Sequence, residues 1–228
     1  MTARPRRLKE VEVITFDCYG TLIDWESGAK GTLRALAAMK DIQGDLDPFF
    51  QAWERAQRAR IEGPYAPYRE IAAECFVQVA RAQQLPFEAS DGATFADSIA
   101  TWKPFPDTPL ALQALKRQVR LGIISNIDDD ILADSVKLMG AEFDLLMTAQ
   151  QARAYKPSAQ PFVRALERLA RLPARIAHAA FGFEYDIITA SALGFRTILV
   201  QRGRTDFPAT PVPDLVVDDL SALAMQFA

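Results

Sequence analysis

The chain has 228 residues, of which 50% are apolar and 24% are charged, and its formal net charge is −3 at pH 7. This is the balance of an ordinary globular protein, and the small negative charge gives no electrostatic basis for binding nucleic acid. Cys18 and Cys75 are too few for a disulfide framework, and the sequence has no Cys/His cluster with zinc spacing and no apolar run of membrane-spanning length, so we expect a cytoplasmic protein without a membrane partner.

The first predicted element is a buried strand that ends at a carboxylate. Residues 13–16 are β-branched or aromatic without polar alternation, which is typical of a strand covered on both faces. Asp17 follows, and residues 18–21 resemble a turn. Ligands of open α/β sheets bind at the carboxyl ends of strands, so Asp17 is predicted to face a crevice. Taken alone, Asp17 is equally consistent with a turn-forming residue that bonds the backbone of Tyr19 or Gly20.

The next segment, residues 26–103, carries helical patterns and no parallel-strand pattern. Apolar residues recur there at spacings of three and four, as on amphipathic helices. A turn-prone Ser-Asp-Gly at residues 90–92 precedes the last of them. The predicted helices are residues 31–40, 48–61, 68–83 and roughly 94–102. We expect residues 26–103 to form a helical cap domain inserted into the core.

From Pro104 onward, strands alternate with helices. The predicted strands are residues 119–125, 143–147, 176–181, 196–201 and 215–217, and the predicted helices are residues 108–118, 128–139, 159–169 and 185–193. Helices between strands at this spacing indicate βαβ units and a parallel sheet. The predicted fold class is therefore α/β, with a doubly wound, Rossmann-like core formed by residues 1–25 and 104–228.

Polar residues at the predicted strand ends are the candidates for chemistry. Parallel strands bring their carboxyl ends to one edge, so Asp17, Ser125 with Asn126, and Asp186 are expected to converge there with Lys156. Each has a structural alternative, since Ser, Asn and Asp cap helices and a lysine can lie in an exposed loop. Their convergence at one crevice favours an active site.

The segment DCYGTL, residues 17–22, resembles the first motif of the haloacid dehalogenase superfamily, in which the strand-terminal Asp is a covalent nucleophile. Ser125 with Asn126 resembles the second motif, Lys156 with Pro157 the third, and Asp186 the carboxylate of the fourth. The order matches along the whole chain, and the helical segment lies where the family has its cap. The resemblance therefore implies the same core and cap fold.

Tyr19 separates two branches of the resembled superfamily. Its phosphatases have at this position an Asp that protonates the leaving alcohol, and a second acid in the fourth motif that helps to hold Mg²⁺; here these positions are Tyr19 and Phe181. The segment is instead similar to 2-haloacid dehalogenases, whose halide needs no proton and which act without a metal. The resemblance implies no cofactor, with Mg²⁺ required only under a phosphatase alternative.

The resemblance assigns the first chemical step to three residues. Asp17 would attack C2 of a short 2-haloalkanoic acid, expel halide and form an ester that water then hydrolyses. Thr21 would support the nucleophile. Lys156 would stabilise Asp17 as the reactive anion.

Substrate binding and the water step fall to the remaining motif residues. Ser125 and backbone N–H groups near Cys18 and Tyr19 would hold the substrate carboxylate. Asp186 would position or activate water, with Asn126 as its hydrogen-bonding neighbour.

The sequence departs from the resembled dehalogenases in the cap and around the fourth motif. The halide-binding arginine of the family falls at Glu54, within a segment that begins at Trp53, so Arg55 or Arg58 is expected to replace it and Trp53 to line the site. A serine, an asparagine and a tyrosine of the family fall at Phe181, Phe183 and Phe162. The three phenylalanines predict less polar support for water, and Phe181 and Phe183 predict a more apolar pocket.

Two further features have structural interpretations. His178 is the only histidine and lies in a predicted strand, which favours a structural role over catalysis. Residues 128–130 are three consecutive acids at a helix start, where they point in different directions, so the helix dipole explains them better than a metal does.

Three functions stay open from the sequence. The first is a metal-independent 2-haloacid dehalogenase with a small carboxylic acid as substrate. The second is a hydrolase of the same superfamily that releases phosphate, with Mg²⁺, or a strained ring amine. The third is a non-catalytic binding protein. Dimers are common in the resembled family, so a homodimer is expected.

Overall fold

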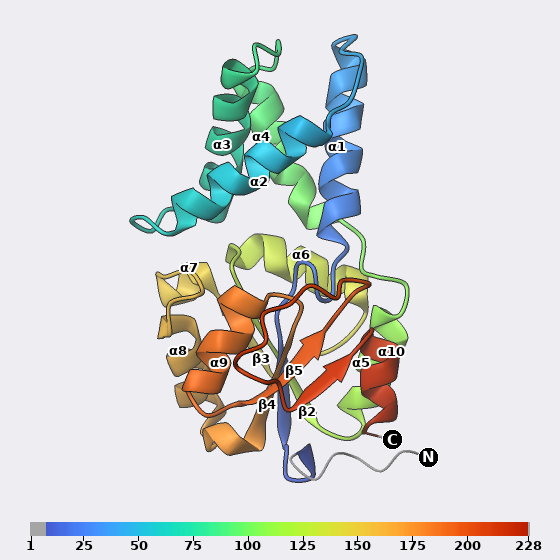
Figure 1. The fold of residues 1–228 in the computed structure, drawn as a ribbon, viewed down its shortest axis with the longest axis vertical. Helices are drawn as coiled ribbons and strands as arrows, with labels where there is room; N and C mark the ends of the chain where they lie inside the picture. Colours follow the sequence, from blue (N-terminus) through green and yellow to red (C-terminus); the bar gives the residue numbers. More distant parts are fainter. Residues whose placement is uncertain (1–7, 228) are drawn as a thin grey trace.

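The computed structural model describes residues 8–227, and a parallel sheet lies at the centre of their lower part (Figure 1). It has six strands in the order β3-β2-β1-β4-β5-β6, and every neighbouring pair is parallel. The strands are β1 (Val13–Phe16), β2 (Arg120–Ser125), β3 (Leu145–Thr148), β4 (Ile176–Ala180), β5 (Arg196–Val200) and β6 (Leu215–Val217). Their carboxyl ends therefore share one edge, with β1 in the middle.

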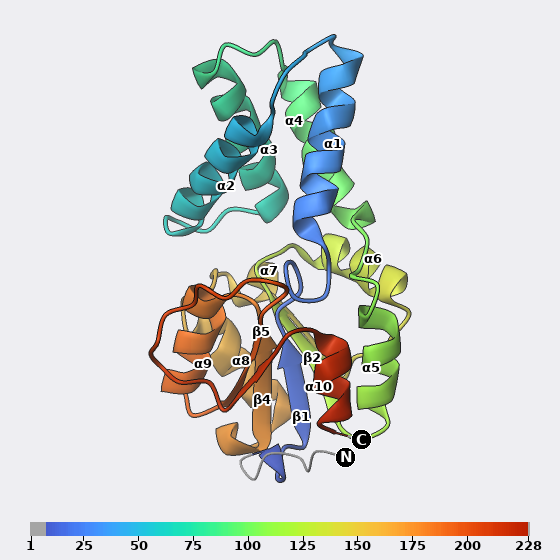
Figure 2. The same cartoon turned by 45° about the vertical axis from the view of Figure 1, so that its right-hand side comes forward.

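Helices cover both faces of the sheet, which confirms the predicted doubly wound α/β core. In Figure 2, α5 and α10 lie on one face and α8 and α9 on the other. Alternate residues of β1 serve the two faces, because Ile14 and Phe16 join one apolar cluster and Val13 the other. The core helices are α5 (Thr108–Lys116), α6 (Asp129–Met139), α7 (Ala149–Ala152), α8 (Gln160–Leu169), α9 (Ile188–Ala192) and α10 (Leu220–Met225).

Four helices stand above the carboxyl edge of the sheet (Figure 1). They are α1 (Trp25–Met39), α2 (Asp47–Ile61), α3 (Tyr68–Ala82) and α4 (Ala89–Ser98). Aromatic rings fill the space between them, with Phe76 contacting Phe49 and Phe95 at centroid distances of 4.9 Å. None of the helices in residues 8–227 is both long enough and apolar enough to cross a membrane.

The chain passes between the sheet and this helical layer at two places that lie side by side. Asp24 precedes α1 and Lys103 follows the last helical turn of the layer, and the N–H of Asp24 donates to the carbonyl of Lys103 at 2.9 Å. Gly28 lies against the Trp102 ring so closely that a Cβ there would come within 2.3 Å of it. The two connections therefore form one compact junction.

The helical layer differs from the sequence prediction in its first and last helices, and α1 begins at Trp25 rather than at residue 31. α4 begins at Ala89, so the expected turn at residues 90–92 is wrong. Glu88 and Asp91 form a capping box, in which each side chain accepts from the backbone N–H of the other. This reciprocal cap stabilises the helix start and outweighs the turn tendency of Gly92.

The chain after β4 also differs from the prediction. The helix expected over residues 185–193 begins as a π-helical turn, Phe183–Ile187, and continues as α9. Its wider turn carries Asp186 inward, where the side chain is 2% exposed. The short helices α7 and α10 were not predicted, because four to six residues are too few for a clear periodic pattern.

Candidate active site

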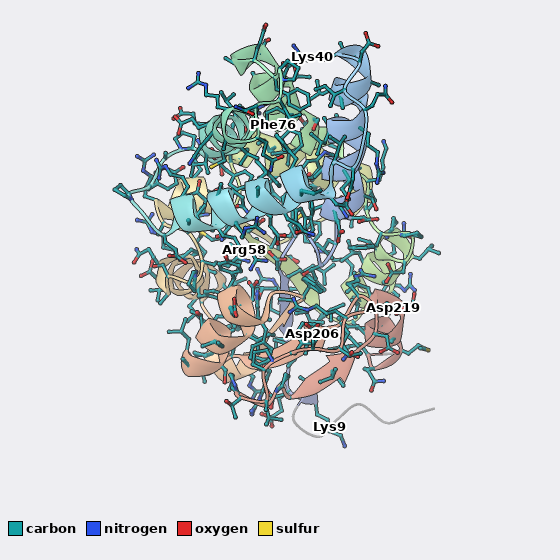
Figure 3. The ribbon with its side chains drawn as sticks, turned by 45° about the horizontal axis from the view of Figure 1, so that its top comes forward. Lys9, Lys40, Arg58, Phe76, Asp206 and Asp219 are labelled. Carbon is teal, nitrogen blue, oxygen red and sulfur yellow. The ribbon has the colours of Figure 1, made fainter. Side chains whose placement is uncertain are left out.

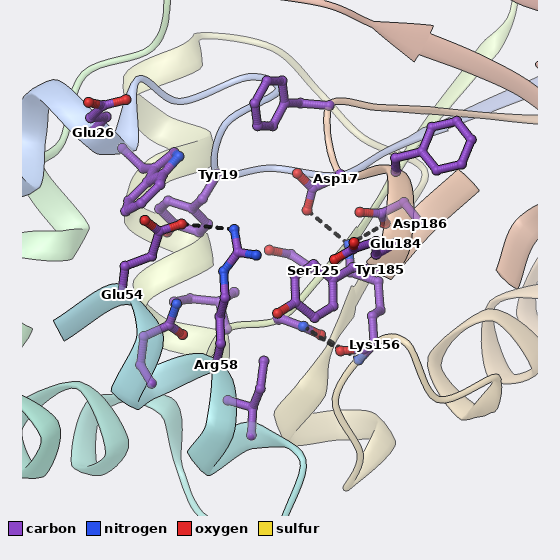
Figure 4. A pocket seen from close by; sticks show the side chains of 18 of the residues that line it. Asp17, Tyr19, Glu26, Glu54, Arg58, Ser125, Lys156, Glu184, Tyr185 and Asp186 are labelled. Carbon is purple, nitrogen blue, oxygen red and sulfur yellow. Dashed lines mark hydrogen bonds and ion pairs between the residues drawn. The ribbon is translucent and has the colours of Figure 1, made fainter. Parts of the chain in front are cut away.

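Asp17 lies directly after β1, a strand in the middle of the sheet, and Figure 4 shows it among the residues that line a pocket. Its N–H donates to the carbonyl of Ala179 in β4, which anchors the residue to the neighbouring strand. The chain then turns sharply, with Leu22 N–H donating to the carbonyl of Cys18 at 2.7 Å. Gly20 adopts a φ of +96°, a left-handed conformation that favours glycine. The turn leaves the Asp17 carboxylate facing a pocket.

Lys156 lies between two carboxylates beneath this pocket. Its Nζ is 2.8 Å from Oδ1 of Asp17 and 2.6 Å from Oδ1 of Asp186, and it also donates to the carbonyl of Ile124 at 2.8 Å. All three donor directions of the ammonium are therefore used. The side chain is 1% exposed, so these contacts replace its hydration. Lys156 and both carboxylates form a single buried charge cluster.

Asn126 holds the backbone of Lys156 rather than Asp186. Its Oδ1 accepts from Lys156 N–H at 2.7 Å, and its Nδ2 donates to the carbonyl of Lys156 at 2.9 Å. The prediction that Asn126 bonds Asp186 is therefore wrong, because both ends of the amide are occupied by main chain. Asn126 instead sets the place from which the ammonium reaches Asp17.

Thr21 fixes the second oxygen of Asp17. Its Oγ1 donates to Asp17 Oδ2 at 2.9 Å and accepts from the N–H of Phe181 at 2.9 Å. The hydroxyl therefore links the turn after β1 to the chain after β4. Both oxygens of Asp17 have defined donors, Lys156 on one side and Thr21 on the other, as the sequence predicted for these two residues.

Within the charge cluster, the pKa values of the three residues are shifted in different directions. Burial, reinforced by the nearby charge of Asp186, raises the pKa of Asp17 despite the opposing effect of Lys156. Burial also acts to raise the pKa of Asp186, but the Lys156 ammonium and a hydrogen bond from His178 outweigh it and hold that pKa below its ordinary value. Burial acts to lower the pKa of Lys156, but the two carboxylates raise it.

His178 is a site neighbour that the sequence analysis did not include. It is fully buried in β4, with Nε2 2.9 Å from Oδ1 of Asp186 and Nδ1 2.9 Å from Oγ1 of Thr15. A signal was present in the sequence, since residues 15 and 17 share one face of their strand and the adjacent parallel strand places residue 178 opposite Thr15. The expected structural role did not take account of this register.

Ser125 ends β2 and borders the pocket beside Asp17. The residue is 2% exposed, and its Oγ has no hydrogen-bond partner within residues 8–227. Tyr19 borders the same pocket with its ring, and its hydroxyl is 2.8 Å from Oγ of Ser135. The side chain of Cys18 is buried in the apolar core and does not border the pocket.

The pocket has a volume of about 550 Å³ and lies between the sheet edge and the helical layer. Aromatic rings from both parts border it. From the helical side come Trp25, Phe50 and Trp102, and from the sheet side come Phe181 and Phe207. Charged groups of both signs accompany these rings, so the pocket combines apolar walls with a few polar positions, as ligand sites do.

Arg58 brings a positive charge into the pocket from α2. Its Nη2 is 2.8 Å from Oε1 of Glu54, and its guanidinium lies 5.5 Å from the centroid of the Tyr185 ring. Arg58 lies on the side of α2 nearer the sheet (Figure 3), and the close view shows it reaching toward Ser125 and Tyr185 (Figure 4). Glu54 and Arg58 are one helical turn apart and therefore share this face.

Two residues assigned to substrate binding lie elsewhere. Arg55 is exposed on α2 and does not border the pocket, so its assignment is wrong. Trp53 is 1% exposed, packs against Phe95 and donates from Nε1 to the carbonyl of Ala72, so its assignment is also wrong. Each residue of a helix turns about 100° from the last, which points Trp53 at the neighbouring helices and Arg55 at solvent.

The donor atoms at the site do not fit a magnesium ion. Residues 8–227 contain no group of three or more His, Cys, Asp and Glu side chains arranged to hold a metal. The Lys156 ammonium stands between the carboxylates of Asp17 and Asp186, where a cation would have to bind both. Mg²⁺ requires several oxygen ligands in octahedral geometry, and Tyr19 and Phe181 supply no carboxylates.

Comparison with known proteins identifies relatives over almost the whole chain. Residues 11–194 match the model of a family described as haloacid dehalogenase-like hydrolase. Haloacetate dehalogenase H-2 of Moraxella sp. (strain B) is 28% identical over 92% of this chain and 98% of its own. The (S)-2-haloacid dehalogenase of Xanthobacter autotrophicus is 26% identical over 84% of this chain and 76% of its own.

Solved structures share the fold. A defluorinating L-2-haloacid dehalogenase, Rha0230, superimposes with a TM-score of 0.84 at 23% identity, over 98% of this chain and 99% of the other. An L-2-haloacid dehalogenase from Xanthobacter autotrophicus gives 0.79 at 24% identity, over 94% and 97%.

Proposed function

The chain belongs to the haloacid dehalogenase-like hydrolase family, and we propose that it is a metal-independent hydrolase that displaces halide from a short 2-haloalkanoic acid. The observation that carries the proposal is the Asp17 carboxylate, oriented by Lys156 and Thr21 at the pocket and accompanied by Tyr19 where a phosphatase needs an acid. The curated relatives are named as haloacetate and (S)-2-haloacid dehalogenases, which supports the same leaving group.

In the first step, a carboxylate oxygen of Asp17 attacks C2 of the substrate. The new C–O bond forms as the carbon–halogen bond breaks, and the halide leaves with the bonding electron pair, so no proton is needed. The raised pKa of Asp17 accompanies a more basic, more nucleophilic anion, and Lys156 keeps that anion in place. The product of this step is an ester of Asp17.

Ser125 and the main chain after Asp17 orient the substrate in this proposal. The unpartnered Ser125 Oγ is a donor at the pocket surface, and a substrate carboxylate is an acceptor that satisfies it. Backbone N–H groups of Cys18 and Tyr19 complete the binding of this carboxylate. Arg58, rather than Arg55, supplies the positive charge that receives the departing halide, since it is the one that borders the pocket.

In the second step, water attacks the carbonyl carbon of the Asp17 ester. The bond from that carbon to the alcohol oxygen breaks, the alcohol oxygen takes one proton from the water, and the other proton passes through Asp186 to solvent. Asp17 regains its carboxylate with one oxygen from water, and a 2-hydroxy acid leaves. Asp186 suits this role because its lowered pKa keeps it ionised as an acceptor.

The helices α1 to α4 act as a cap domain in this proposal, with residues 26–103 closing the pocket over residues 1–25 and 104–228. A homodimer and a cytoplasmic location stay predictions from the sequence.

The test is halide release from 2-chloropropionate and fluoroacetate, with Mg²⁺ and with a chelator, beside an aryl phosphate under the same conditions. We expect halide release that the chelator leaves unchanged. Phosphate release that requires Mg²⁺, without halide release, contradicts the proposal. Turnover of neither class supports a binding protein instead.

Replacement of Asp17 tests the nucleophile. We expect Asp17→Asn to abolish halide release, whereas Asp134→Asn, an exposed acid on α6, leaves it unchanged. A single turnover in H₂¹⁸O, with enzyme in excess, is expected to place the label in the peptide that contains Asp17, as read by mass spectrometry. Label found only in the hydroxy acid contradicts an ester intermediate.

A further inference from the structure

We propose that His178, in strand β4, is a positioning residue that holds Asp186 through a hydrogen bond donated by Nε2. The effect of this role on the reaction rate rests on the proposed function, but the position of the proton on His178 is testable without any substrate. The residues that carry the inference form one buried line, in which Thr15 contacts His178, His178 contacts Asp186, and Asp186 contacts Lys156.

The line is built into neighbouring strands of the sheet. Thr15 in β1 pairs in register with His178 in β4, and both side chains are fully buried. Oγ1 of Thr15 is 2.9 Å from Nδ1, and Oδ1 of Asp186 is 2.9 Å from Nε2. The Phe162 ring lies edge-on to the imidazole with centroids 5.0 Å apart. Both nitrogens are occupied, and the packing leaves the ring little room to turn.

The partners of the imidazole decide where its proton lies. An ionised carboxylate only accepts, and the lowered pKa of Asp186 keeps it ionised, so Nε2 must donate. The Thr15 hydroxyl then donates to Nδ1 at 2.9 Å, since its alternative acceptor, the carbonyl of Ala177, is 3.4 Å away. These partners favour the arrangement in which Nε2 carries a proton and Nδ1 accepts.

This hydrogen bond fixes which oxygen of Asp186 faces the reaction. Oδ1 accepts from both the Lys156 ammonium, at 2.6 Å, and His178. Oδ2 of Asp186 is bonded by neither Lys156 nor His178. It lies close to Gly182, where the Cβ of any other residue would come within 2.6 Å of it. A residue at position 182 with a side chain would therefore displace it. The carboxylate is held by one oxygen and presents the other.

The residues that precede Asp186 at the pocket do not supply such a donor from their side chains. Phe181 and Phe183 precede it in the chain and have no polar side-chain atoms. Without His178, only Lys156 would hold Oδ1 of Asp186, and Lys156 also binds Asp17. The Lys156 ammonium would therefore shift when Asp17 loses its charge on forming an ester. His178 contacts Asp186 and not Asp17, and it therefore keeps Asp186 oriented after the first step has removed that charge.

The first experiment reads the proton directly. The chain has one histidine, so ¹⁵N-histidine labelling of protein made without a histidine tag reports only His178. We expect a protonated Nε2 with a slowly exchanging proton and an unprotonated Nδ1 at neutral pH. Thr15→Val should weaken this preference, whereas Thr197→Val, the register neighbour in β5, should leave it unchanged. A proton on Nδ1 with none on Nε2 overturns the inference.

The second experiment separates the two chemical steps with 2-chloropropionate. His178→Leu removes the donor, and we expect steady-state turnover to fall about tenfold or more while the first burst of chloride persists. The Asp17 ester should then accumulate and be visible as added mass. His178→Gln retains an N–H donor and should recover much of the rate. A His178→Leu variant that turns over like the wild type, or that loses the burst, overturns the inference.

Failure of this inference is distinguishable from failure of the proposed function. If the wild type releases no halide, the dehalogenase proposal fails, and the nitrogen spectra still decide the position of the proton. If His178→Leu does not fold, the comparison moves to His178→Gln and Thr15→Val, for which a rate and a spectrum identical to those of the wild type count against the inference.

Discussion

At the scale of single residues, one lysine makes two nearby carboxylates unequal. Lys156 contacts Asp17 and Asp186 at similar distances, yet the pKa of Asp17 is raised and that of Asp186 is lowered. Burial and the neighbouring charge of Asp186 raise the pKa of Asp17, whereas Lys156 and the hydrogen bond from His178 outweigh burial at Asp186. Two buried acids with separated protonation properties suit two roles, a nucleophile and a group that handles water.

The raised pKa of Asp17 sets the pH range of the reaction. Only the ionised carboxylate attacks C2, so kcat/KM should fall as the pH drops through a value above the ordinary 3.8 of aspartate. The pKa of Lys156 is raised above its ordinary 10.5, so deprotonation of this residue should cause no loss below that pH. The pH profile of kcat/KM for chloride release checks both limits. An acid limb at or below pH 3.8 contradicts the expectation.

Thr21 should affect stability and activity together. Thr21→Val leaves the partly buried N–H of Phe181 without its acceptor, and we expect the free energy of unfolding to fall by about 1–2 kcal/mol. Because the variant also loses the donor to Asp17, kcat/KM should decrease. Urea unfolding and halide release measure the two effects. Thr21→Ser keeps the hydroxyl and should restore most of both; equal behaviour of the two variants would contradict this account.

Most of the charge cluster was predictable, from a strand end and from the motif resemblance. A strand end fixes both the place and the direction of the next side chain, which is why Asp17 lies where expected. Lys156 lies beyond β3 and α7, so its contact with Asp17 was expected from the motif resemblance and not from a strand end. Side chains on α2 were harder to place. Its face toward the pocket mixes polar and aromatic residues, so the pattern does not reveal which of Glu54, Arg55 and Arg58 points inward.

At the scale of elements, the start of α6 is joined to the start of α3. Oδ1 of Asp128 accepts from the N–H of Tyr68 at 2.9 Å, and Oδ2 accepts from the N–H of Arg69 at 2.8 Å. A side chain of the core thus caps a helix of the upper layer. The sequence analysis assigned Asp128 to its own helix dipole, because a cap supplied by a distant segment leaves no local pattern.

Removal of this cap should loosen the helical layer. Asp128 is 4% exposed, and Asp128→Ala leaves two N–H groups of α3 without acceptors, so we expect the free energy of unfolding to fall by about 1–2 kcal/mol. Asp130→Ala removes only an exposed ion pair with Arg69 and should change it by less than about 0.5 kcal/mol. Chemical denaturation of both variants is the measurement. Equal effects would contradict the capping role.

At the scale of the whole molecule, Arg202 joins three distant parts of the chain. Its Nη1 is 2.8 Å from Oδ1 of Asp107 before α5, and its Nη2 donates to the carbonyl of Thr21 at 2.6 Å. The guanidinium also lies 4.0 Å from the centroid of the Phe105 ring. The loop after β5 is thereby connected to the turn that carries the nucleophile. This contact was not predictable, because its members are far apart in the chain and share no local pattern.

Loss of Arg202 should destabilise the protein more than loss of an exposed arginine. Arg202→Met leaves the largely buried Asp107 carboxylate without its cation, and we expect a decrease of about 3–5 kcal/mol in the free energy of unfolding. Arg202→Lys should recover only part of it, because an ammonium cannot form the same paired contacts. Thermal and urea unfolding provide the values. A change below about 1 kcal/mol, as expected for an exposed pair, would contradict this role.

The parallel α/β architecture was predictable from the sequence, whereas the strand order and the start of α4 were not. Alternating strands and helices after Pro104 predict a parallel sheet, and the observed strand order places β1 in its middle. The order itself was not predictable, because strands of similar apolar character pair equally well in several arrangements. The position of α4 depended on one local cap, which competed with an equally local turn signal.

The junction at Asp24 and Lys103 has a consequence for how such enzymes diversify. Both connections between the layers meet at one hydrogen bond, whereas Asp17, Lys156 and Asp186 all belong to the sheet side. Under the proposed domain division, exchange of the gene segment that encodes residues 26–103 replaces Phe50 and Arg58 together and leaves the reactive groups unchanged. Grafting this segment between homologues should transfer substrate preference and leave the chemistry of the recipient intact.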